Sequence, residues 1–139
     1  MEDAVTRYRA ASEAGDIDAI MATLAPDAEL VSPVSGRMVF RGRDDLRVLL
    51  AAVYGAVGMS GLHWHQELGD GSVRVLVGEA RLGPLPLGDA MVLELAPDGQ
   101  IRRMRPHLRP WLTLTLVALR LGPRLARHPG VVRRALRRR

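Results

Sequence analysis

The chain has 139 residues, enough for one domain with its own core, and its 47% of hydrophobic residues excludes a disordered polymer. It has no cysteine, which excludes disulfides, a thiolate nucleophile and thiolate metal ligands, and which suits the cytoplasm. The net charge of +5 is uneven: residues 1–109 hold 12 arginines and 15 acidic residues, whereas residues 110–139 hold eight arginines and no acid. The mildly acidic body argues against a nucleic-acid partner.

The N-terminal third is expected to be mainly helical. The acidic start Met1-Glu2-Asp3-Ala4 does not resemble a signal peptide. Helical spacing predicts a first helix from about Ala4 to a stop at Gly15 and a second from an Asp16 cap to Pro26-Asp27. Short strands are predicted at residues 28–33 and 38–40, followed by a third helix over residues 42–55.

After this third helix, hydrophobic residues recur at every second position, as is typical of strands. Four longer strands are predicted, at residues 62–68, 72–82, 89–95 and 100–109. They are joined by turns at Asp70-Gly71 and Asp98-Gly99 and by a connection over residues 83–88. Helices followed by an antiparallel meander indicate an α+β domain over residues 1–109.

Residues 110–139 form a basic extension, which we expect to be helical. Alternation of leucine and threonine over residues 112–116 leaves a strand open as the alternative. We expect Leu112, Leu116 and Leu119 to pack on the domain and residues 131–139 to face solvent. Arg120, Arg124 and Arg127 share a helical face if the helix tolerates Pro123. This face is either solvated or in peripheral contact with an anionic membrane; no run reaches the ~18 apolar residues of a spanning helix.

Several segments in a fixed order resemble a known superfamily. They are residues 8–21 with their Gly15-Asp16 step, the sequence LAPDAEL at 24–30, residues 31–34 and 40–46, and Asp98-Gly99-Gln100-Ile101. Over residues 4–109 the chain resembles SnoaL-like and ketosteroid-isomerase-like proteins of the nuclear-transport-factor-2-like superfamily. The resemblance implies a cone of three N-terminal helices on a curved antiparallel sheet. It also implies a homodimer through the outer sheet face, here at Arg105, His107 and Arg109.

Ketosteroid isomerases use a tyrosine on the first helix, a carboxylate base before the proline of the first strand, and a protonated acid on a later strand. By resemblance, Tyr8 matches the tyrosine and Ser32 stands at the position of the base. Met91 stands near the acid, with Asp89 two residues earlier on the same strand face. Because serine does not shuttle protons unaided at neutral pH, isomerisation by that mechanism is not expected.

The best catalytic candidates are Tyr8 and Asp89, which we expect to meet across the cavity and orient a carbonyl or hydroxyl group. The alternatives are a core aromatic role for Tyr8 and a turn or cap role for Asp89. His63 is a reserve acid–base group, sharing a strand face with His65. Trp64 on the opposite face favours histidines that point outward.

A metal site or a second carboxylate site is the weaker interpretation of the remaining polar residues. A metal bound by the two histidines would need His107 or Glu79 as a third ligand, and we expect no metal or other cofactor. Glu79 and Arg81 share a face, as in the carboxylate–arginine arrangement of limonene-epoxide-hydrolase-like proteins. An exposed ion pair explains them better.

The expected cavity is mainly apolar, and its predicted lining is Leu30, Ser32, Leu50, Tyr54, Met91, Leu93 and Met104. Such a lining suits a hydrophobic small molecule and cofactor-free acid–base chemistry, such as cyclisation, isomerisation or hydration. A non-catalytic binding or assembly module is the alternative, and a closed core without ligand would explain the same apolar residues.

Overall fold

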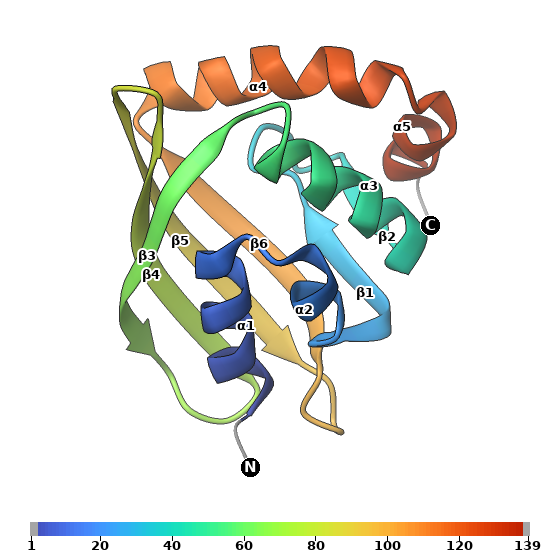
Figure 1. Cartoon of the computed structure of the whole chain (residues 1–139). Coiled ribbons are helices and arrows are strands. Elements are labelled where there is room, and N and C mark those ends of the chain that lie inside the picture. The colour runs from blue at the N-terminus through green and yellow to red at the C-terminus, as the bar shows by residue number, and fades with distance from the viewer. Residues whose placement is uncertain (1–2, 138–139) are drawn as a thin grey trace.

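A computed structural model describes residues 3–137, so Met1 and Glu2 of the acidic start lie outside the described residues. Its helices are α1 Ala4–Ala14, α2 Ile17–Met21, α3 Arg43–Tyr54, α4 Trp111–Ala126 and α5 Pro129–Leu136. Its strands are β1 Leu24–Val31, β2 Val39–Arg41, β3 Met59–Leu68, β4 Val73–Leu82, β5 Leu85–Leu95 and β6 Ile101–Arg109. The helices cover one face of a curved, open sheet, which confirms the α+β cone (Figure 1).

The strands form one sheet in the order β2-β1-β6-β5-β4-β3. All neighbours are antiparallel except β1 and β6, which run parallel. This parallel pair lets the last long strand return beside the first one, so the meander that follows α3 closes onto the N-terminal segment. The sheet remains unclosed between β2 and β3.

The helix termini follow their local sequence. Asp3 caps α1 by accepting a hydrogen bond from the Thr6 amide at 2.8 Å, and Gly15 ends it in the left-handed conformation at φ 66°. Asp16 caps α2 by accepting from the Ala19 amide at 3.1 Å. These caps confirm the predicted break between the two helices at the Gly15-Asp16 step.

Two expected boundaries are wrong. The second helix ends at Met21 instead of Pro26, because Leu24 already pairs with Ile101 at the start of β1. Residues 83–88 are not a connection, because Gly83 (φ 60°) and Pro84 alone form the turn and β5 begins at Leu85. The prolines and glycines of this segment obscured the alternation of hydrophobic residues at every second position, which runs through β5.

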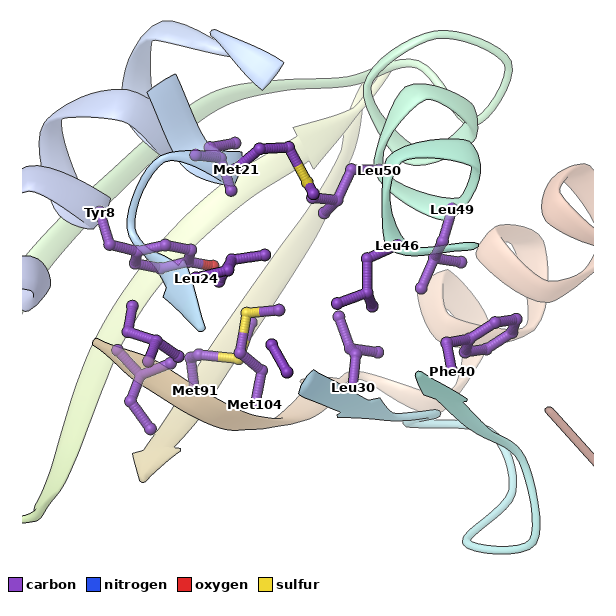
Figure 2. Close-up of a cluster of buried hydrophobic side chains, with 14 of the residues drawn as sticks. Tyr8, Met21, Leu24, Leu30, Phe40, Leu46, Leu49, Leu50, Met91 and Met104 are labelled. Atoms are coloured by element: carbon purple, nitrogen blue, oxygen red, sulfur yellow. The ribbon is translucent and has the colours of Figure 1, made fainter. Parts of the chain in front are cut away.

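The core lies between the helices and the concave face of the sheet. Leucines of α3 meet Leu30 of β1, Phe40 of β2 and Met104 of β6, while Tyr8 reaches in from α1 (Figure 2). A second, smaller cluster joins Val57, Leu82 and Leu87 to Val117 of α4. The extension after residue 109 therefore contributes to the hydrophobic core.

The extension is helical, as expected, and the helix continues through Pro123 on its exposed side. However, the prediction for its packing was wrong at several positions. Leu112 and Leu119 are 58% and 66% exposed, and the inward face is instead Val117, Leu121 and Leu125, which recur every four residues. No helix among residues 3–137 is long and apolar enough to cross a membrane.

The last helix is also more buried than expected. Val131 and Ala135 of α5 are in the core, whereas we expected residues 131–139 to face solvent. Arg134 donates two hydrogen bonds, at 2.8 and 2.9 Å, to the buried carboxylate of Asp45 in the first turn of α3. This pair holds α5 against α3; residues 138 and 139 lie outside the described part of the chain.

Candidate functional site

An apolar cavity of about 390 Å³ lies between the concave face of the sheet and the helices. Its walls come from α1, α3, β1, β3 and β5, and α4 and α5 cover its end as a roof. The volume falls within the range of sites that enclose small organic molecules. Few polar side chains reach this cavity, so each of them is a candidate for contact with a bound molecule.

Asp89 is the one carboxylic acid among the described residues that line the cavity. On β5 it lies two residues from both Leu87 and Met91, so it shares the concave face with these buried side chains and is itself half-buried. One carboxyl oxygen accepts a hydrogen bond from the His107 amide at 3.3 Å. Burial raises the pKa of Asp89 to about 7, although this hydrogen bond opposes the shift. Near neutral pH both the acid and the carboxylate are therefore populated.

Tyr8 and Tyr54 bring phenol groups from α1 and α3 to the same cavity. Burial, followed by the charges of Tyr54 and Asp89, raises the pKa of Tyr8 well above its usual value. Burial and the charge of Asp89 raise the pKa of Tyr54 to about 12. Both phenols stay protonated at neutral pH and can donate, and within residues 3–137 neither hydroxyl has a hydrogen-bond partner.

Tyr8 is held in place by a network between α1 and β3. Trp64 is buried and its indole nitrogen donates to the Ser12 hydroxyl at 2.9 Å, which in turn donates to the Tyr8 carbonyl at 2.7 Å. The Trp64 amide donates to Glu13 at 2.8 Å, and the rings of Tyr8 and Trp64 lie 6.5 Å apart. Gly78 makes room for the indole, because a Cβ there would lie 2.7 Å from the ring.

Most residues expected in the cavity do line it, namely Tyr8, Leu30, Ser32, Leu50, Tyr54, Asp89 and Met91. Leu93 and Met104 do not, because they lie in the closed core with no exposed surface. Ser32 faces the cavity, but its hydroxyl accepts hydrogen bonds from the amides of Val34 (3.1 Å) and Ser35 (3.4 Å). Its oxygen therefore stabilises the turn after β1.

His63 and His65 lie on the outer face of the sheet, outside the cavity, while Trp64 points inward. His63 contacts the Glu13 carboxylate at 3.0 Å, so the structure places the expected reserve acid–base group outside this cavity. His65 lies 3.7 Å from Glu79, which pairs with it instead of Arg81. Among residues 3–137, no three potential ligands gather closely enough to hold a metal ion.

The roof supplies lining residues that the sequence argument missed. Val117, Ala118, Leu121 and Leu125 of α4 and Val132 of α5 all face the cavity. The available signal was the spacing of four residues between Val117, Leu121 and Leu125, which places them on one helical face. The alternation of leucine and threonine just before them obscured this pattern.

Known proteins resemble this chain in sequence pattern and in fold. A family model for the SnoaL-like domain matches residues 5–104. An uncharacterised protein from Silicibacter pomeroyi with a cystatin-like fold has a TM-score of 0.85 at 23% identity, over 97% of this chain and 95% of its own. A steroid delta-isomerase from Pseudomonas aeruginosa has a TM-score of 0.78 at 23% identity, over 91% and 92%.

A third structure, TerC co-crystallized with polyporic acid, has a TM-score of 0.68 at 22% identity, over 82% of this chain and 95% of its own. No functionally curated protein matches the sequence significantly. At these identities the structural neighbours establish the fold.

Proposed function

This chain belongs to the SnoaL-like domain family, and from that premise we propose that its cavity binds a hydrophobic small molecule and exchanges a proton with it through Asp89. The observation that carries the proposal is the Asp89 carboxyl group in the wall of an apolar cavity, where burial raises its pKa to about 7. A catalytic acid or base is most effective when its pKa lies near the working pH. TerC, a protein of the same fold, has been crystallized with an organic acid.

The groups around Asp89 suit a substrate with a carbonyl group. The ionised carboxylate takes a proton from the carbon beside the carbonyl, and the phenols of Tyr8 and Tyr54 donate hydrogen bonds to the oxygen that gains charge. The same carboxyl group, now protonated, returns the proton to another atom. Because Ser32 offers no second base, one group performs both transfers. Cyclisation, isomerisation and hydration all include such transfers.

Two matched probes test the binding half of the proposal. A bicyclic phenol, 2-naphthol, donates a hydrogen bond and should bind better when Asp89 is ionised, above about pH 7. A bicyclic ketone, 1-tetralone, accepts a hydrogen bond and should bind better when Asp89 is protonated, below about pH 7. Asp89→Asn should abolish both pH dependences, and Tyr8→Phe should weaken tetralone binding by up to about tenfold. Ala118→Phe, which fills the cavity from the roof, should weaken both probes. If Ala118→Phe bound both probes as tightly as the wild type, the proposed binding site would be wrong.

The catalytic half is tested by hydrogen–deuterium exchange at the carbon beside the tetralone carbonyl. We expect the wild-type protein to accelerate this exchange in deuterated buffer, with a rate that rises through about pH 7 as Asp89 ionises. Asp89→Asn should return the rate to that of buffer alone.

A non-catalytic binding module is the second candidate. One observation favours it: the hydroxyl of Ser32, at the position where related isomerases hold a base, is occupied within a turn. This candidate predicts that both probes bind while wild-type protein and Asp89→Asn exchange tetralone hydrogens equally slowly.

A further inference from the structure

The roof, α4 and α5, has two faces with different chemistry. Its inward face, with Val117, Leu121 and Leu125, lines the cavity. Within residues 3–137 no helix or strand covers its outward face, because α4 runs along one end of the molecule (Figure 1). The composition of this outward face is not explained by the fold or by the proposed cavity chemistry.

Large apolar side chains lie on the outward face. Leu112 and Leu119 are 58% and 66% exposed and lie seven residues apart, so they share one side of α4. Trp111, in the first turn of the same helix, is 78% exposed. Isolated exposed leucines are common on protein surfaces, but two leucines on one side of a helix, flanked by a tryptophan in its first turn, form a larger apolar surface. We call Trp111, Leu112 and Leu119 the outer stripe.

Exposed arginines also lie on the roof. Arg124 and Arg127 of the roof are exposed, as is Arg133 of α5, and within residues 3–137 none of them makes an ion pair. The extension contains no acidic residue, and within residues 3–137 only its Arg134 makes an ion pair, with Asp45 of α3. Arginine side chains next to leucine and tryptophan on a surface helix are typical of helices that lie in the interface of an anionic bilayer.

We propose that the outward face of the roof docks on an anionic lipid surface, with the outer stripe inserted among the acyl chains and the roof arginines at the headgroups. Charge complementarity carries this assignment: the net charge of residues 110–139 is +8, whereas that of residues 1–109 is −3, so the molecule presents one attractive end. The acidic body then faces away from the membrane, which fixes the orientation.

Two other occupants fit the outward face less well. A second copy of the same face would bring arginines against arginines, with no acidic residue of the extension to separate them. A nucleic acid would engage the arginines but would leave Leu112 and Leu119 exposed, because phosphate contacts need no apolar stripe. Of these three occupants, only a lipid surface uses the apolar and the basic residues together.

The test uses the full chain and vesicles of phosphatidylcholine with or without phosphatidylglycerol, separated by flotation. At low salt we expect binding to the anionic vesicles only, and loss of binding as salt screens the charges. Arg124→Gln with Arg127→Gln should weaken binding by about 25-fold, about fivefold for each arginine. Leu112→Ser with Leu119→Ser should weaken it by at least about tenfold.

Matched controls lie at the opposite end of the sheet. The control for the leucine double variant is Leu68→Ser with Val73→Ser. Both residues lie in the β3–β4 hairpin, and each is 47% exposed. Arg7→Gln with Arg102→Gln controls for the loss of two positive charges. Both controls should bind vesicles like the wild type. Circular dichroism verifies that every variant is folded.

Fluorescence gives a second readout. Trp111 is exposed and Trp64 is buried, so the emission of Trp111 should shift to shorter wavelength on vesicle binding, and Trp111→Phe should remove the shift. No binding to anionic vesicles at low salt would overturn the proposal, as would unchanged binding in the leucine double variant or binding to duplex DNA instead of vesicles. None of the substituted roof residues lines the cavity, so these results are independent of probe binding.

Discussion

The burial of Asp89 makes a specific prediction about stability. Its pKa is about 7 in the folded protein against 3.8 for the free side chain, so the folded state binds this proton more tightly than the unfolded state. The contribution of Asp89 to the free energy of unfolding is fully present below about pH 4 and is lost as the pH rises to about 7. A shift of about three units corresponds to at most about 4 kcal/mol.

Replacing Asp89 by asparagine removes this titration while keeping the shape of the side chain. Relative to the wild type, Asp89→Asn should become more stable by up to about 4 kcal/mol between about pH 4 and pH 8. Urea unfolding of both proteins across this range measures the difference, in which all other titrating groups cancel. Asp70→Asn, in the exposed turn before β4, is the control and should show no such trend. A difference between wild type and Asp89→Asn that stays constant with pH would show that the half-buried Asp89 is not desolvated beside the apolar cavity.

Three further predictions concern the packing of the core and the assembly of the chain. Ser12→Ala leaves the buried indole nitrogen of Trp64 without its acceptor and should lower the free energy of unfolding by about 1–3 kcal/mol, whereas Ser60→Ala, at an exposed site, should not. Removing residues 110–139 takes away the buried side chains Val117, Leu125 and Val131 and should destabilise the rest by several kcal/mol, on the order of 1.5–3 for each buried side chain lost; unchanged thermal stability would show that the roof does not pack. We also predict a homodimer through the outer sheet face around Arg105 and His107, which sedimentation showing only monomer at micromolar concentration would exclude.

The sequence was sufficient for the elements that depend on local signals. Gly15 and Asp16 mark the break between two helices because a left-handed residue and a capping carboxylate are local requirements. Trp64 was correctly expected to point inward because the strand period is two and its neighbours are histidines. Tyr8 and Asp89 were found through their resemblance to a known arrangement, and both line the cavity.

What could not be predicted depends on contacts between distant segments. The roof faces the cavity because Arg134 pairs with Asp45, 89 residues earlier, and because Arg120 donates to the Val57 carbonyl at 2.9 Å. Leu93 and Met104 differ from Met91 only in how deeply the helices cover them, which the alternation along a strand does not encode. The pKa of Asp89 likewise arises from burial by several elements together.

The most direct test of the central claim is a titration of the Asp89 side-chain carboxyl group followed by carbon-13 NMR. Asp89→Asn assigns the signal by its disappearance. We expect a midpoint near pH 7, the value at which the carboxyl can both give and take a proton in the cavity. A midpoint near the 3.8 of a solvated aspartate would contradict it.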